Sequence, residues 1–135
     1  MNAEIISVGT ELLLGQVVNT DAAIVAQALS GLGINLLYSA VVGDNADRLR
    51  YAVETAISRS DLLIMTGGLG PTTDDLTKET TAAAAGKKLA LHEESLRRIE
   101  NYFNEKHVSE NQAKQAWLPE GCTVLQNDNG TAPGC

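Results

Sequence analysis

A run of apolar residues that leads directly into a glycine-rich loop decides the fold: Leu62-Leu63-Ile64-Met65-Thr66-Gly67-Gly68-Leu69-Gly70-Pro71-Thr72-Thr73-Asp74-Asp75. An apolar run of this length, bounded by glycine, predicts a buried β-strand. We expect this strand at the centre of a sheet that is covered on both faces. A helix is predicted to follow over residues 76–85, because Gly86 ends that segment.

Two further strand–helix units precede this one. Strands are predicted over residues 4–8 and 34–42. Asn19, Thr20 and Asp21 are N-cap candidates for the first helix, and Asp44 is interpreted as the cap of the second. Both helices carry apolar residues at helical spacing: Ile24, Val25, Ala28, Leu29 and Leu32 in the first, and Leu49, Ala52, Val53, Ala56 and Ile57 in the second. Three successive units predict an α/β fold with parallel strands and right-handed crossovers.

The pattern changes after residue 91. A polar helix is predicted over residues 92–107, a short helix over 109–117 and a strand over 122–125. A loop with the sequence Gly130-Thr131-Ala132-Pro133-Gly134 follows. Because the chain stops on this loop, we expect the domain of residues 1–135 to be incomplete at its C-terminus.

Composition and charge exclude several functions. The 135 residues carry a formal net charge of −7, and the densest basic cluster, Arg97-Arg98, is flanked by glutamates. Nucleic-acid binding is not expected, because phosphate backbones require clustered cations. Cys122 and Cys135 lack the spacing of a zinc site. No signal peptide or membrane span is visible, so we expect a cytoplasmic protein without a membrane partner.

Four segments are expected at the carboxyl ends of parallel strands, where open α/β sheets bind their ligands. They are residues 9–15, 43–44, 67–75 and 130–134. The glycine-rich loop is the strongest of them, because Gly67, Gly68 and Gly70 let backbone amides approach a phosphate at a helix N-terminus. A tight turn without a ligand is the alternative interpretation. Standard motifs do not decide the matter: Thr73 replaces the third glycine of a dinucleotide fingerprint, and no P-loop or nucleophile elbow is present.

Two carboxylates follow this loop. Asp74 and Asp75 would repel a phosphate unless a divalent cation lay between them, and Mg²⁺ takes one or two carboxylates together with phosphate oxygens and water. The sequence therefore predicts a divalent metal, Mg²⁺ in the first instance, held by Asp74 and Asp75. The alternative is that these side chains, and Asp44, only cap helices. His92 and His107 are interpreted as ordinary solvated side chains.

The motifs and their order resemble the N-terminal domain of the CinA family of competence/damage-inducible proteins, within the molybdopterin-binding (MoCF) superfamily. The resemblance rests on residues 9–15 (GTELLLG), Asn19-Thr20, residues 66–75 (TGGLGPTTDD) and residues 130–134 (GTAPG), and it covers essentially the whole chain. In the molybdopterin branch the loop has the sequence GGTG. Here Leu69 takes the threonine position, which favours CinA, although Asp75 and Thr77 still match that branch's Asp-x-Thr.

The resemblance implies a three-layer α/β/α domain with a mostly parallel sheet, and a metal-dependent ADP-ribose pyrophosphatase that yields AMP and ribose 5-phosphate. Asp74 and Asp75 would be the catalytic residues and the metal ligands. The ligand, a nucleotide or a pterin, would be bound by Gly9, Thr10, Glu11, Asp44, Gly67, Gly68, Gly70, Thr72, Gly130 and Thr131. A homo-oligomer is also expected.

Two other functions stay open. The first is molybdopterin binding or adenylylation, as in molybdenum cofactor synthesis. The second is a non-catalytic nucleotide-binding or oligomerisation module of a longer nicotinamide-mononucleotide deamidase.

Overall fold

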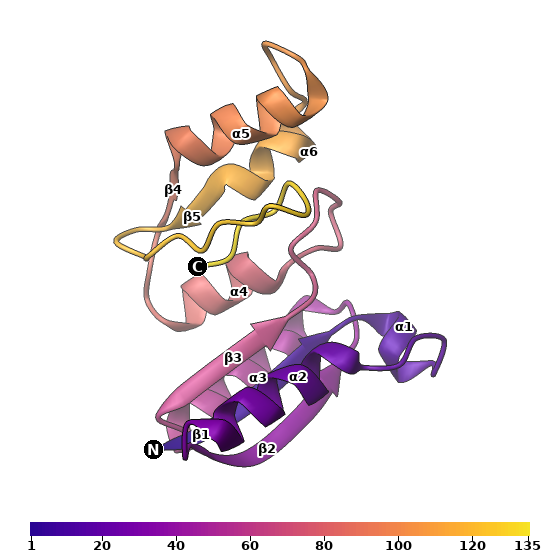
Figure 1. Ribbon diagram of the computed structural model, residues 1–135, viewed down its shortest axis with the longest axis vertical. Helices are drawn as coiled ribbons and strands as arrows, with labels where there is room; N and C mark the ends of the chain where they lie inside the picture. Colours follow the sequence, from indigo (N-terminus) through magenta and orange to yellow (C-terminus); the bar gives the residue numbers. More distant parts are fainter. The chain divides into compact units, whose positions relative to one another are not determined.

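The computed structural model describes residues 1–135, and the chain divides into two compact units, residues 1–68 and residues 69–135 (Figure 1). The first unit is built on a three-stranded sheet of β1 (Asn2–Val8), β2 (Asn35–Val42) and β3 (Leu62–Thr66), in the order β2-β1-β3. Both pairings are parallel, and Ile5 lies opposite Ser39 on one side and Ile64 on the other. The predicted parallel strands are confirmed.

The central strand is β1, so the expectation that residues 62–66 lie at the centre was wrong. Six successive residues of β1, from Ala3 to Val8, are buried, whereas every residue of β3 is only half-buried. Strand β1 is covered by a helix on each face and by a strand on each edge. Strand β3 has a strand neighbour in this sheet on one edge only.

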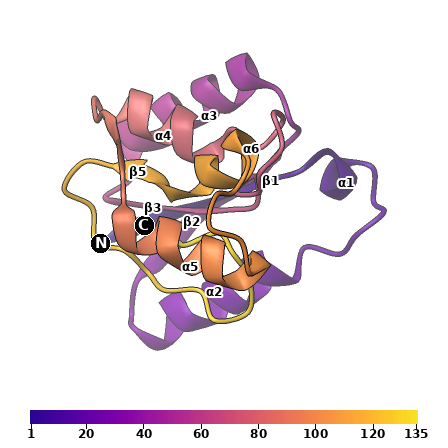
Figure 2. The ribbon, with the colours of Figure 1, turned by 90° about the horizontal axis from the view of Figure 1, so that it is seen from above.

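Helices cover both faces of this sheet. The long helices α2 (Thr20–Gly31) and α3 (Ala46–Arg59) lie on opposite sides of it, and a short helix α1 (Thr10–Leu13) follows β1 (Figure 2). Ala3 and Ile5 pack against Leu29 of α2, whereas Glu4 of the same strand contacts Arg59 of α3. This alternation is that of a strand buried on both faces, and it confirms the three-layer α/β/α arrangement.

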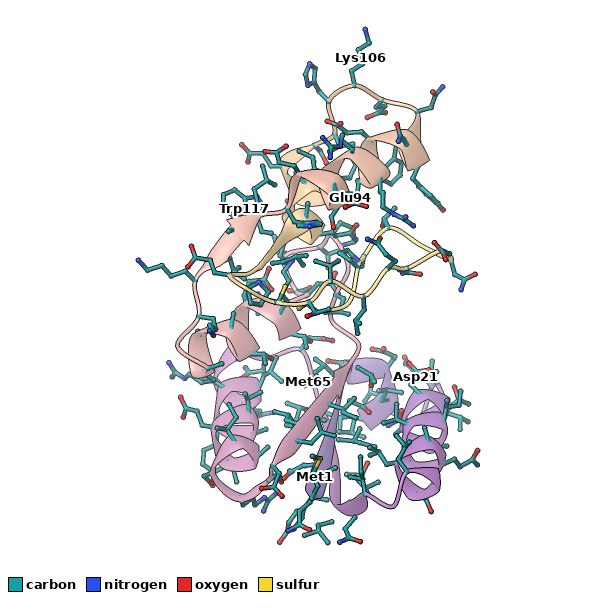
Figure 3. All side chains as sticks on the ribbon, turned by 60° about the vertical axis from the view of Figure 1, so that its left-hand side comes forward. Met1, Asp21, Met65, Glu94, Lys106 and Trp117 are labelled. Atoms are coloured by element: carbon teal, nitrogen blue, oxygen red, sulfur yellow. The ribbon has the colours of Figure 1, made fainter.

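The apolar face of α2 is narrower than its sequence pattern predicts. Leu29 is buried and Val25 is packed against the core, but Ile24 and Leu32 are 65% and 75% exposed. The residues that meet the sheet are spaced by three or four positions: Ala22, Val25, Ala26 and Leu29. Side chains of the first unit fill the space between strands and helices, with Asp21 and Met1 at opposite ends of it (Figure 3).

A buried carboxylate is the main electrostatic feature of this unit. Glu4 is 2% exposed, and its two oxygens accept hydrogen bonds from Arg59 at 2.7 Å and 3.0 Å. The hydroxyl of Ser60 donates a third bond at 3.2 Å, and the Arg59 guanidinium lies 3.6 Å from the centre of the Tyr38 ring. A charge this deeply buried is stable only when it is paired.

Replacing Arg59 with methionine is therefore expected to lower the melting temperature by several degrees. The change leaves the carboxylate of Glu4 in the core without its ion pair. The matched control is Arg50→Met, because Arg50 pairs with Asp47 on the surface and exposed pairs contribute little. Thermal unfolding followed by circular dichroism compares the two variants. Equal shifts would show that the burial of Glu4 does not matter.

The second unit contains three helices, a 3₁₀ turn and two short strands. They are α4 (Thr77–Ala84), β4 (Leu89–Leu91), α5 (Glu93–Phe103), α6 (Glu110–Ala113), η1 (Lys114–Ala116) and β5 (Trp117–Pro119). Strands β4 and β5 pair antiparallel, with Leu91 opposite Trp117, and Ile99, Ala116 and Leu118 are buried. The helix predicted over residues 76–85 is confirmed apart from one residue at each end.

Several predictions for this unit were wrong. The helix expected over residues 109–117 ends early. After the cap Ser109, α6 has only four residues, and the chain then turns through η1 into β5. The strand expected over residues 122–125 is reduced to one bridge between Leu125 and Gly134. His92 is not an ordinary solvated side chain: it caps α5 by accepting the backbone N–H of Ser95.

None of the helices combines the length and the hydropathy needed to cross a membrane.

Candidate functional site

A cleft of about 210 Å³ lies at the carboxyl ends of β1 and β3 in the first unit. This is the edge at which open parallel sheets bind ligands. Glu11 and Gly67, two of the predicted ligand-binding residues, line it. The remaining wall comes from the strand ends, from α1 and the segment after it, and from the start of α2: Val8, Leu12, Val17, Val18, Asn19, Thr20, Asp21 and Thr66.

Gly67 lies where the end of β3 closely approaches β1. Its φ is 80°, which side chains rarely adopt, and a Cβ atom here would overlap the carbonyl oxygen of Val8. Gly68 also has a positive φ, of 65°. Only glycine fits the first of these positions, and Gly67 lines the cleft.

Asn19 and Thr66, which the sequence analysis did not assign to the site, form hydrogen bonds that join the walls of the cleft. Asn19 caps α2 by accepting the N–H of Ala22 at 3.2 Å, and its amide donates to the hydroxyl of Ser7 at 2.9 Å. Thr66 donates to the same hydroxyl at 3.1 Å. The cap was predictable, but the partnership with Ser7 was not, because Ser7 lies in a buried strand 12 residues earlier in the sequence.

Asp44 does not cap α3, so the cap interpretation of this residue was wrong. The residue that caps α3 is Asn45, which accepts the N–H of Arg48 at 3.0 Å. The Asp44 carboxylate instead accepts the N–H of Thr10 at 3.0 Å, and the Thr10 hydroxyl accepts the N–H of Asp44 at 3.1 Å. With the bond from Gly9 N–H to the carbonyl of Val42, these contacts join the loops that follow β1 and β2.

In the second unit, the loop before α4 forms hydrogen bonds to the side chain of Asp75. One carboxylate oxygen of Asp75 accepts both the N–H and the hydroxyl of Thr72, at 3.0 Å and 2.6 Å. A Cβ on Gly70 would overlap this carboxylate. The structure therefore brings together Gly70, Thr72 and Asp75. The helix-capping interpretation is wrong, because α4 begins after Leu76 without any side-chain cap.

A lysine that the sequence analysis missed supports this loop. The Nζ of Lys114 donates to the carbonyl oxygen of Thr72 at 2.8 Å and to that of Asp75. The carbonyl of Lys114 in turn accepts the Nζ of Lys78, a buried residue of α4, at 2.7 Å. Burial and the neighbouring charge of Lys114 lower the pKa of Lys78. Single lysines on polar segments give no sequence signal for such contacts.

The carboxylate of Asp75 is held in its charged form. Burial tends to raise its pKa, but hydrogen bonds from the side chain and N–H of Thr72 and from the N–H of Gly70, with the charge of Lys114, lower it more. The net result is a pKa below the ordinary value of 3.8. Asp74, in contrast, is exposed, and its carboxylate has no hydrogen-bond partner.

The lowered pKa of Asp75 predicts how stability changes in acid. A depressed pKa in the folded state contributes stability above the unfolded pKa, and this contribution is lost as the pH falls through the folded value. As the pH falls below about 4, the parent chain should therefore lose more unfolding free energy than Asp75→Asn. Urea unfolding over a pH series measures both. Parallel profiles would mean that the contacts with Thr72 do not stabilise the charged form.

The carboxylates of Asp74 and Asp75 suit only a metal site whose other ligands come from phosphate oxygens and water. No group of three or more His, Cys, Asp or Glu side chains that could hold a metal ion is present. Mg²⁺ needs only one or two carboxylates when phosphate oxygens and water complete its shell. An anionic Asp75 beside an exposed Asp74 fits a cation that arrives with a phosphorylated ligand. It does not fit a closed protein cage.

Gly130 and Thr131 line a second pocket, of about 140 Å³, in the second unit. Its other walls come from α5 and the loop around residue 128: Ser95, Arg98, Tyr102, Gln126, Asn127, Asp128 and Pro133. The expectation that residues 130–134 follow a strand of the parallel sheet was wrong. This loop belongs to the unit of residues 69–135 and is anchored by the bridge between Leu125 and Gly134.

A three-layer α/β unit with a cleft at the carboxyl ends of parallel strands defines a class of domain that binds small ligands. The sequence model of a family described as "Probable molybdopterin binding domain" matches residues 4–135. The fold alone is shared with the molybdopterin biosynthesis enzyme MoaB of Thermus thermophilus, at 15% identity and a TM-score of 0.61, over 87% of this chain and 78% of that one.

Nearer relatives narrow this class. A CinA-like protein of Desulfovibrio desulfuricans is 58% identical over 135 residues, which cover 100% of this chain and 32% of that protein. The crystal structure of the protein CinA from Thermoplasma acidophilum matches with a TM-score of 0.92 and 38% identity, over 98% of this chain and 79% of that one. The chain belongs to the CinA family, within the molybdopterin-binding superfamily. It spans about a third of the length of the curated relatives that it matches.

Proposed function

We propose that the chain binds a nucleotide-like phosphorylated ligand and hydrolyses the pyrophosphate bond of ADP-ribose with a divalent metal. The observation that carries this proposal is the glycine-rich loop that ends in an anionic carboxylate, with a second, unpartnered carboxylate beside it. A small anionic ligand together with a hard cation suits such a loop. ADP-ribose is chosen because of the resemblance to the CinA family.

Each predicted residue has a role in this proposal. The backbone amides of Gly67, Gly68 and Gly70 bind phosphate, and Asp74 and Asp75 hold the metal and orient a water molecule. When bound, the cation would polarise the phosphoryl group and acidify its water. In the hydrolysis, the oxygen of a water molecule would bond to one phosphorus while the bridging P–O bond breaks with its electron pair on the leaving phosphate. The protons of the water would pass to solvent, and the products would be AMP and ribose 5-phosphate. The other residues proposed to bind the ligand are Gly9, Thr10, Glu11, Asp44, Thr72, Gly130 and Thr131.

Molybdopterin binding is the second candidate. It is favoured by the family description, and by Asp75 and Thr77, which match the Asp-x-Thr of the molybdopterin branch. Since the chain spans a third of its curated relatives, a non-catalytic nucleotide-binding or oligomerisation role within a longer deamidase stays a proposal as well.

Ligand-dependent stabilisation and product release distinguish these functions. ADP-ribose, AMP and a pterin are each added with and without Mg²⁺, and a ligand at about 100 times its Kd should stabilise the fold by about 2.7 kcal/mol. Chromatography then measures AMP released from ADP-ribose. Metal-dependent release supports the pyrophosphatase. Stabilisation by the pterin alone supports the second candidate, and stabilisation by nucleotide without release supports the binding module.

A further inference from the structure

The pocket of the second unit contains a single pair of opposite charges. Arg98 and Asp128 are the only charged residues in its wall, and the other side chains there are neutral hydroxyls, amides and a phenol. Arg98 lies on α5, whereas Asp128 lies on the loop that leads to Gly130 and Thr131. The pocket has a volume of about 140 Å³, which is large enough to admit a phosphoryl group.

The guanidinium of Arg98 is occupied by the chain itself. Its Nη2 donates to a carboxylate oxygen of Asp128 at 2.8 Å, and it also lies 3.4 Å from the carbonyl oxygen of Asn127. The side chains of Arg98 and Asp128 are 44% and 86% exposed. Exposed pairs of this kind contribute little to stability, so an incoming anion can displace the carboxylate at small cost. A phosphoryl group offers more acceptor oxygens than one carboxylate and matches the planar guanidinium.

The loop that carries Asp128 is held by hydrogen bonds within itself. The amide of Asn127 donates to the carbonyl of Ala132 at 2.9 Å and accepts the N–H of Asn129 at 3.0 Å. Leu125 and Gly134 exchange two backbone hydrogen bonds of 2.9 Å below it. Binding therefore requires a rotation of the exposed Asp128 side chain, without refolding of the loop.

From this arrangement we propose that Arg98 is the anion-recognition residue of the pocket, and that Asp128 is an internal substitute that a phosphoryl group of a small molecule replaces. The inference rests on the proposed function in one respect, because Gly130 and Thr131 belong to both. It adds a specific contact, between the Arg98 guanidinium and the phosphoryl oxygens. It also adds an autoinhibitory carboxylate that sets the affinity.

Titration calorimetry of the full chain, without metal, tests the roles of Arg98 and Asp128. Removing these two charges should change the affinity in opposite directions. The probes are inorganic phosphate, AMP and adenosine, which lacks the phosphoryl group. Arg98→Gln should weaken phosphate and AMP at least about tenfold, whereas Asp128→Asn should strengthen both about threefold or more. In the double variant, the gain from Asp128→Asn should disappear. Binding of phosphate alone identifies the free ion as a ligand, and a response restricted to AMP identifies the nucleotide.

Two controls remove the same charges elsewhere. Arg97→Gln changes the neighbouring exposed residue, and Glu94→Gln removes a negative charge from an exposed position of α5 (Figure 3). Neither residue lines the pocket, so both variants should bind AMP like the parent. Equal affinities of the parent and Arg98→Gln would overturn the inference. If Glu94→Gln raised the affinity for AMP as much as Asp128→Asn does, the effect would be one of net charge, and the inference would also be overturned.

The outcome can be separated from that of the proposed function. If AMP is released from ADP-ribose but the affinity for AMP does not depend on Arg98, this inference fails and the proposed pyrophosphatase stands. If Arg98 governs AMP binding but no hydrolysis occurs, the inference stands and the pyrophosphatase fails.

Discussion

Replacing Gly67 with alanine should lower the free energy of unfolding by about 3 kcal/mol or more. Two costs add at this position. The backbone has a φ of 80°, which alanine adopts only with strain, and the new Cβ would overlap the carbonyl oxygen of Val8 in the central strand. Because β1 is buried on both faces, it cannot move aside without disturbing α2 or α3. Urea unfolding measures the loss.

Gly86→Ala is the matched control for this prediction. Gly86 has a φ of 66°, but no atom lies within 4 Å of the position that its Cβ would take. Only the conformational cost applies there, and the expected loss is about 1 kcal/mol. Similar losses at both positions would show that the close approach of β3 to β1 costs nothing. The glycine would then be explained by its φ alone.

Asp75→Asn should reduce metal-dependent cleavage of ADP-ribose at least about a hundredfold, while the chain melts at nearly the parent temperature. The amide oxygen of asparagine can still accept the N–H and hydroxyl of Thr72, so the loop keeps its shape. The expected loss of folding free energy is under about 1 kcal/mol. A neutral amide, however, is a much weaker ligand for Mg²⁺ than a carboxylate. Product release is measured over a series of Mg²⁺ concentrations.

Two further variants complete this test. Asp74→Asn should behave like Asp75→Asn or more mildly, because its carboxylate is exposed. Asp47→Asn makes the same chemical change at an exposed position in the first turn of α3 and should keep full activity. If both Asp74→Asn and Asp75→Asn cleave ADP-ribose at the parent rate, the metal assignment is wrong. If both unfold, the two carboxylates are structural.

Much of the candidate site was predictable because its residues carry local signals. Glycines that follow an apolar strand indicate a close approach or a positive φ, and Gly67 shows both. Asn19 before an amphipathic segment indicates a cap, which the structure confirms. Asp44 and Asp75 also stood out, but their partners are not the helix amides that the capping interpretation expected. Thr10, 34 residues away, binds Asp44, and Thr72 binds Asp75 from the preceding loop.

The sequence by itself determined the α/β class and, in the first unit, the parallel strands and the loops that follow them, because each depends on the period of apolar residues and on local turn residues. Only the tertiary structure decided which strand is central, which face of α2 is buried, and that Arg98 meets Asp128 and Lys114 meets the loop at Thr72. Such contacts join residues 30 to 42 positions apart. Their energies depend on which elements pack together, and no local pattern records that.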